Sequence, residues 1–164
     1  MTSKFPIGKI GKPHGLKGYA YIYLNEYLKH YSYSGILAEV NENEIYIEKI
    51  NKHLKDRHLV KIIGLDTIEQ IENYRGKSVF LKRTHLLELN IYLPWPELFI
   101  GEALMTQDKK QPVLSNYYVS IINTTIELTL DNNVFLIPYD KENFDFNGKN
   151  LRMNKDLTFY NPIE

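Results

Sequence analysis

The segment IGKIGKPHGLKGYAYIYL, Ile7 to Leu24, places a glycine-rich basic run between two stretches of strand character. A hairpin needs only a two-residue turn, so the turn alone does not explain the eight residues of GKPHGLKG. Glycines let backbone N–H groups approach a partner closely, and Lys12, His14 and Lys17 add positive or donor groups. The run is therefore predicted to contact a phosphate backbone. The alternative is that the glycines serve a strained turn and the lysines are only solvated.

Known phosphate-binding motifs do not account for this run. The phosphate-loop spacing fails from both Gly8 and Gly11, and the dinucleotide fingerprint is also absent. Gly15-Leu16-Lys17-Gly18 matches the GxxG loop of single-strand RNA-binding KH domains. That loop joins two helices, whereas this one is predicted to join two strands, so the match is weak.

Working outward from this segment, the hydrophobic pattern predicts short strands with one helix among them. Thr67 and Gln70 have capping-box spacing and Gly76 has the position of a helix stop, so the helix is expected near residues 67–75. The strands predicted by alternation and turn residues in this half are 19–24, 36–40, 45–50, 58–63 and 78–82.

A domain boundary is predicted where Pro94 and Pro96 flank Trp95, because proline fixes the chain in an extended form. We expect an N-terminal domain over residues 1–86, a linker over 87–97 and a second domain over 98–164. Further strands are predicted at 99–105, 113–122, 124–130 and 134–139, with a hairpin at Asn147-Gly148. The predicted fold class is mainly β, with two small β-barrels in series that remove exposed sheet edges.

Composition argues against catalysis and metal binding. The chain has no cysteine, and its five histidines show no metal-ligand spacing. No nucleophile elbow is present, so no catalytic residue, metal site or cofactor is expected. The absence of cysteine, of a secretory signal and of a long apolar run favours a cytoplasmic protein that does not enter a membrane.

Charge is unevenly distributed along the chain. Residues 1–90 hold 14 Lys and Arg against 10 Asp and Glu, a net charge of +4, whereas residues 91–164 hold 6 against 10, a net charge of −4. The asymmetry suits an anionic partner for the first half and a basic partner for the second, although chance is an equal alternative. A second basic cluster, KHLKDRHLVK (Lys52–Lys61), either widens an RNA-facing surface or forms a solvated hairpin.

The opening segment resembles that of the RimM family of ribosome maturation factors. Gly8-Lys9-Ile10 and Pro13-His14-Gly15-Leu16-Lys17-Gly18 stand where that family's motif expects them. GLDTIEQIENYRGKSVFLKRTHL, LPWPELFIGEAL and NNVFLIPYDKENFDFNGKNLRM are similar to its later segments, in the same order. The resemblance implies a translation-factor-like N-terminal barrel and a C-terminal PRC barrel.

The resemblance further implies a non-catalytic, monomeric factor. It would bind the immature small (30S) ribosomal subunit, contact a head ribosomal protein, and assist head assembly and 16S rRNA processing. The expected RNA or pre-ribosome contacts are Lys9, Lys12, His14, Gly15, Lys17 and Gly18. The expected ribosomal-protein contacts are Tyr92, Trp95 and Glu97. Tyr92 or Trp95 takes the role of the family's paired tyrosines, and Glu97 stands for an aspartate of its motif. Core packing is the alternative for Trp95.

Two other functions stay open at this point. One is a small-molecule- or flavin-binding barrel enzyme, against which the absence of a paired base and nucleophile argues. The other is a stand-alone RNA-binding module that uses only the GxxG loop. This module would bind bare RNA with a steep salt dependence and without a ribosomal protein.

Overall fold

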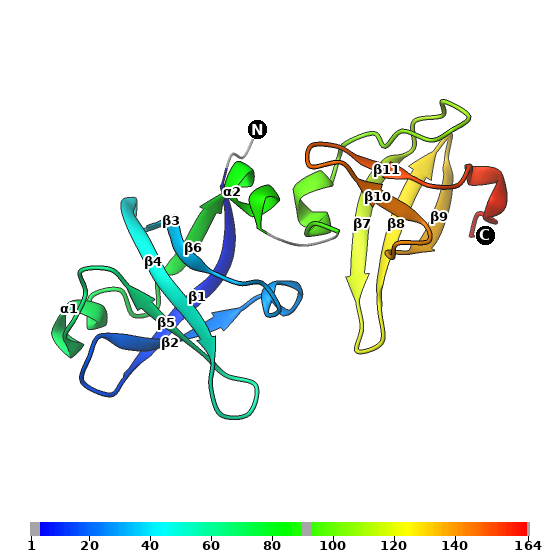
Figure 1. Cartoon of the computed structure of the whole chain (residues 1–164). Helices are drawn as coiled ribbons and strands as arrows, with labels where there is room; N and C mark the ends of the chain where they lie inside the picture. Colours follow the sequence, from blue (N-terminus) through cyan, green and yellow to red (C-terminus); the bar gives the residue numbers. More distant parts are fainter. Residues whose placement is uncertain (1–3, 90–92, 164) are drawn as a thin grey trace. The chain divides into compact units, whose positions relative to one another are not determined.

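The computed structural model describes residues 4–89 and 93–163, and it divides into two compact units between residues 90 and 91 (Figure 1). The first unit is built around a closed barrel, and the second contains smaller open sheets. The mainly β fold class predicted from the sequence is confirmed. No helix within the described residues combines the length and apolarity needed to cross a membrane.

Six antiparallel strands close the barrel of the first unit in the order β1-β2-β5-β4-β3-β6. Closure comes from the long first strand, which pairs with β2 on one side and with β6 on the other. Every sheet edge is thereby paired within the unit. The strands are β1 (Lys4–His14), β2 (Tyr19–Leu24), β3 (Ser34–Val40), β4 (Asn43–Lys52), β5 (His58–Ile62) and β6 (Ser78–Lys82).

Alternation along the strands fills the barrel. On β2, Ala20 and Ile22 are buried at 0% and 2% exposure, whereas Tyr23 is 63% exposed on the outside. Ile7 and Ile10 of β1 are also buried, although they are three positions apart, and the register with β6 shifts between Pro6 and Gly8. The period-two pattern therefore holds for Ala20 and Ile22 of β2 but not for β1.

Two short helices belong to this unit. Helix α1 (Ile68–Glu72) has the predicted capping box: the Gln70 backbone N–H donates to Thr67 Oγ1 at 3.2 Å, and the Thr67 N–H donates to Gln70 Oε1 at 3.1 Å. Helix α2 (Arg83–Glu88) directly follows β6 and was not expected; it begins without a side-chain cap and buries Leu86. A 3₁₀ turn, η1 (Glu26–Leu28), follows β2.

The second unit contains a three-stranded sheet, β7-β8-β9, and a two-stranded sheet, β10-β11. Its elements are η2 (Pro96–Phe99), β7 (Val113–Val119), β8 (Thr124–Leu130), β9 (Asn133–Pro138), β10 (Phe144–Phe146), β11 (Leu151–Met153) and η3 (Leu157–Phe159). The strand expected over 99–105 forms only isolated bridges, at Ala103 and Met105. The assignment of this unit to the PRC barrels stays a prediction.

Candidate nucleic-acid interface

The glycine-rich run is mostly strand. Strand β1 continues to His14 and pairs there with Tyr19, so only Gly15–Gly18 forms the turn. The register between β1 and β2 shifts between Ile10 and Pro13, which marks a β-bulge. The bulge and the four-residue turn together account for the length of a run that a simple hairpin does not need.

The glycines meet structural demands of the barrel itself. Gly18 has φ +86°, and a Cβ at this position would lie 2.0 Å from the carbonyl oxygen of Leu65. A Cβ at Gly11 would lie 2.6 Å from Cε2 of Tyr23. The close backbone approach that the sequence suggested for a partner is therefore used by the protein's own chain at these two positions.

The side chain of His14 lies between the β1–β2 hairpin and the β4–β5 hairpin. The Tyr21 hydroxyl and His14 Nδ1 are 3.2 Å apart, and the His14 and His53 ring centroids are 4.7 Å apart. Arg57 completes the cluster, because its guanidinium lies 5.3 Å from the centroid of the Tyr21 ring. Hence the GKPHGLKG hairpin and the β4–β5 hairpin meet at one end of the barrel, where Figure 1 shows both turns.

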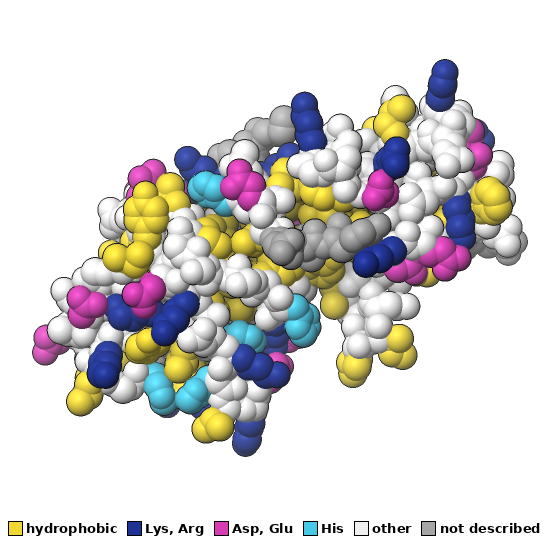
Figure 2. All heavy atoms as spheres, viewed as in Figure 1, with side chains coloured by type: hydrophobic (Ala, Val, Ile, Leu, Met, Phe, Trp, Pro, Cys, Tyr) yellow, Lys and Arg dark blue, Asp and Glu magenta, His cyan; other side chains and the backbone are white. Residues whose placement is uncertain are grey.

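Most of the charge at this end is positive. We call it the basic hairpin end and define it by Lys12, His14, Lys17, Lys52, His53, Lys55 and Arg57. Within the described residues, none of its four lysines is within ion-pair distance of a carboxylate. Figure 2 shows histidine side chains beside Lys and Arg side chains over this part of the barrel.

The nearby carboxylates are already occupied. Lys29 Nζ lies 2.8 Å from Glu26 Oε1 and 2.8 Å from Asp56 Oδ2. Its hydrogen bond to Asp56 holds the pKa of that carboxyl below its usual range, so Asp56 stays ionised and bound to Lys29.

The exposed Arg57 and Lys55 line a groove of about 470 Å³ with Tyr21 and Tyr23. Cations and aromatic rings side by side are the groups that bind phosphates and unstacked bases.

The structure does not bring all of the predicted RNA contacts together. Lys12 and Lys17 are exposed at the basic hairpin end, with Gly15 and Gly18 in its turn. Lys9 pairs with Tyr23 further along β1, so it lies on the outer wall of the barrel. Sequence reasoning left Lys52–Lys61 open as either a widening of the RNA-facing surface or a solvated hairpin, and it missed Tyr21 because that residue belongs to a strand pattern.

The predicted ribosomal-protein contacts have different environments. Tyr92 lies outside the described residues. Trp95 is 3% exposed, and its Nε1–H donates to the hydroxyl of Tyr117 at 3.1 Å. The pKa of the Tyr117 hydroxyl is raised by its own burial and by the half-buried carboxylate of Glu97. The hydrogen bond from Trp95 lowers this pKa, but by less than the other effects raise it. Trp95 and Glu97 thus meet at Tyr117, which sequence reasoning did not single out.

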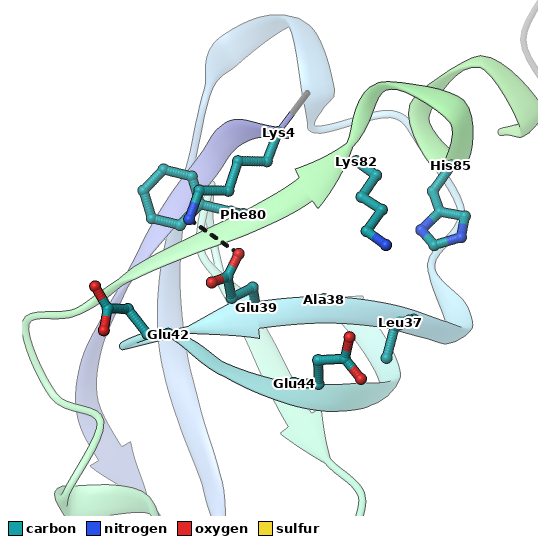
Figure 3. Close-up of a pocket in the computed structure, with 9 residues that line it drawn as sticks. All are labelled: Lys4, Leu37, Ala38, Glu39, Glu42, Glu44, Phe80, Lys82 and His85. Carbon is teal, nitrogen blue, oxygen red and sulfur yellow. Dashed lines mark hydrogen bonds and ion pairs between the residues drawn. The ribbon is translucent and has the colours of Figure 1, made fainter. Parts of the chain in front are cut away.

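A pocket elsewhere on the barrel has mixed charge (Figure 3). In Figure 3, Lys82 and His85 reach from β6 and α2 towards β3, which carries Glu39. Lys4 Nζ already lies 3.0 Å from Glu39 Oε2. The volume is about 190 Å³, below the roughly 300–1,000 Å³ of typical small-molecule sites. Among the described residues no three His, Asp or Glu side chains gather as metal ligands.

Comparison with known proteins connects this barrel to a family. The model of the RimM N-terminal domain matches residues 5–86, which contain all of the barrel except Lys4. The chain belongs to the RimM family. The RimM match covers the β1–β2 and β4–β5 hairpins, and therefore both halves of the basic hairpin end.

Curated RimM relatives extend the similarity beyond the barrel. The ribosome maturation factor RimM of Buchnera aphidicola is 25% identical over 143 residues, which cover 84% of this chain and 85% of the relative. That of Lactobacillus gasseri is 33% identical over 94 residues, 54% of each chain. The names of these relatives are those of a maturation factor and not of an enzyme.

Among solved structures, the crystal structure of a RimM-type 16S ribosomal RNA processing protein from Pseudomonas aeruginosa aligns with 95% of this chain and 99% of its own. The identity is 19% and the TM-score 0.41.

Proposed function

We propose that this protein is a non-catalytic ribosome maturation factor that binds the immature small ribosomal subunit. In this proposal the basic hairpin end lies against 16S rRNA, and the second unit contacts a ribosomal protein of the head. The convergence of two basic hairpins around His14, Tyr21 and His53 is the observation that supports it most. Membership of the RimM family supplies the ribosomal context.

Electrostatics favours RNA at the basic hairpin end. When lysines that lack a carboxylate partner bind RNA phosphates, the counterions condensed on the RNA are released. This release supplies an affinity for RNA that does not depend on its sequence. The His14 and His53 rings, which meet edge to face, and the Arg57–Tyr21 pair add flat groups on which bases can stack. Lys12, Lys17, Lys52 and Lys55 are the phosphate contacts of the proposal, with Lys9 as an outlying contact on the barrel wall.

The mechanism is selective binding. A factor without a catalytic step changes assembly only by binding one arrangement of the subunit head better than the others. It dissociates once the mature arrangement no longer offers those contacts. The net charge of −4 over residues 91–164 suits a basic ribosomal protein as the second contact. Tyr92, Trp95 and Glu97 remain the proposed contacts there, with buried Trp95 acting through Tyr117.

Co-sedimentation tests this proposal. The purified chain is centrifuged with immature and with mature small subunits, at low and at moderate salt. We expect it to co-sediment with the immature particle only, and more weakly after Lys12→Gln and Lys17→Gln. A well-folded chain that binds neither particle would overturn the proposal. Equal binding to bare 16S rRNA, with the same salt dependence, would instead support a stand-alone RNA-binding module.

A further inference from the structure

The β7–β8 hairpin of the second unit carries an exposed apolar tip. Ile121 and Ile122 are 105% and 91% exposed, and Figure 2 shows hydrophobic side chains at this tip. Large aliphatic side chains are rarely left fully in water at two adjacent positions. Their exposure points to a binding role for the tip.

The tip is held in one shape by its own hydrogen bonds. The Ser120 N–H donates to the carbonyl oxygen of Asn123 at 2.8 Å. The N–H groups of Ile122 and Asn123 lie 3.3 and 3.2 Å from Ser120 Oγ. The two isoleucines are therefore presented by an ordered turn, which reduces the entropy lost on binding.

The apolar surface continues onto the outer face of the three-stranded sheet. Tyr118 is 48% exposed on β7, and Leu136 is 43% exposed on β9. Glu127 of β8 lies between these strands and pairs directly with Leu136. We call Tyr118, Ile121, Ile122, Glu127 and Leu136 the hairpin face.

Glu127 is a fixed carboxylate within this face. Ser115 Oγ lies 2.8 Å from its Oε2, and the Tyr118 hydroxyl donates to its Oε1 at 2.9 Å. Among residues 4–89 and 93–163 no Lys or Arg forms an ion pair with it. A positioned carboxylate among apolar groups suits a Lys or Arg side chain flanked by apolar residues.

We propose that the hairpin face docks a basic ribosomal protein, with Ile121 and Ile122 in an apolar pocket and Glu127 bound to a Lys or Arg of that protein. The proposal rests on the function proposed above and names the surface of its second contact. Residues 116–126 contain no charged side chain, so the tip offers no cation to RNA phosphates. Pairing of this face with the second unit of another copy is disfavoured because residues 91–164 carry a net charge of −4 in each copy.

Photo-crosslinking tests the identity of the partner. A photo-reactive amino acid replaces Ile122 in the full chain, which is mixed with purified immature small subunits and irradiated. Mass spectrometry after nuclease treatment then identifies the adduct. We expect a ribosomal protein. An adduct to rRNA or to a second copy, or no adduct while the chain co-sediments, would overturn the hairpin proposal alone.

Binding measurements with variants of the hairpin face are the second test of this proposal. We expect Ile121→Ser with Ile122→Ser to weaken co-sedimentation by about tenfold or more, and Glu127→Gln to weaken it less. Phe159→Ser, at a side chain that is 71% exposed in η3, is the matched control and is expected to bind normally. Equal loss in the control would contradict the proposal. Failure of the unchanged protein to co-sediment would overturn the proposed function and this docking surface together.

Discussion

At the scale of single residues, Gly18 is the position where backbone geometry allows least change. Its φ of +86° is strained for any L side chain, and an added Cβ would meet the Leu65 carbonyl oxygen at 2.0 Å. We expect Gly18→Ala to lower the free energy of unfolding by about 3 kcal/mol or more, since both backbone strain and a clash apply. Urea unfolding followed by circular dichroism measures this difference.

Gly15→Ala is the matched control for this prediction. Gly15 has a similar φ of +74°, but a Cβ there meets no atom within 4 Å. Only the conformational cost of roughly 1 kcal/mol is then expected. Equal losses at the two positions would show that the contact with Leu65 contributes nothing.

A second prediction concerns His58, which is 7% exposed at the start of β5. Burial lowers its pKa, Lys29 and Lys52 lower it further, and Asp56 opposes them. Because the folded pKa is below the unfolded value of about 6.5, the unfolded chain binds the proton first as the pH falls. The stability contributed by neutral His58 is therefore complete above that value and decreases below it.

Urea unfolding at several pH values between 8 and 5 checks this sign. We expect the decrease in unfolding free energy below pH ~6.5 to be smaller in His58→Gln than in the unchanged protein. A decrease of the same size in the variant would show that other groups cause it.

At the opening motif, the alternative that its glycines serve a strained turn fits the structure, because Gly15 and Gly18 both have positive φ there. The predicted contact with a phosphate backbone stays a prediction. The contact between His14 and His53 could not be predicted, because 39 positions separate them and their hairpins become neighbours only through the pairing of β2 with β5. Similarly, no pattern distinguishes a buried tryptophan from an exposed anchor, and Trp95 is 3% exposed.

At the scale of elements, the β4–β5 hairpin is expected to contribute phosphate contacts beside the β1–β2 hairpin. Each lysine that binds a phosphate steepens the decrease of log K with log salt concentration by about 0.7–0.9. We therefore expect Lys52→Gln with Lys55→Gln to reduce that slope by about 1.4–1.8 in binding to immature small subunits. Titration over a salt series measures the slope.

The control exchanges two exposed lysines of the second unit, Lys109→Gln with Lys149→Gln. It changes the total charge by the same amount and is expected to leave the slope nearly unchanged. A reduction of the same size in the control would mean that net charge, and not the basic hairpin end, sets the salt dependence.

Elements with a local start signal were predictable, and those without one were not. The Thr67–Gln70 capping box marks α1 in the sequence, and both of its hydrogen bonds are present. Helix α2 begins at Arg83 without a capping side chain, so nothing in the sequence separates it from strand β6. The strand expected over 99–105 fails because Gly101, with φ +87°, turns the chain.

At the scale of the whole molecule, the two units differ in how completely their sheets are paired. All six ladders of the barrel close within the first unit, whereas the second unit has open sheets of three and two strands. Domains of fewer than about 80 residues are only marginally stable. At an open sheet edge, the backbone groups bond to water instead of to a neighbouring strand. The second unit is therefore expected to unfold at a lower urea concentration than the barrel.

Trp95, the sole tryptophan of the chain, makes this difference measurable. It is buried and hydrogen-bonded to Tyr117 in the second unit, so its fluorescence reports the unfolding of that unit. We expect the fluorescence transition to have a lower urea midpoint than the circular dichroism signal, which averages over both units. Trp95→Phe keeps an aromatic ring in the core but removes the hydrogen bond from Nε1 to Tyr117. We expect this variant to shift the first part of the dichroism transition, where the second unit unfolds, to lower urea. The later part, where the barrel unfolds, is expected to stay in place. Coincident transitions in the unchanged protein would mean instead that the two units unfold as one cooperative body.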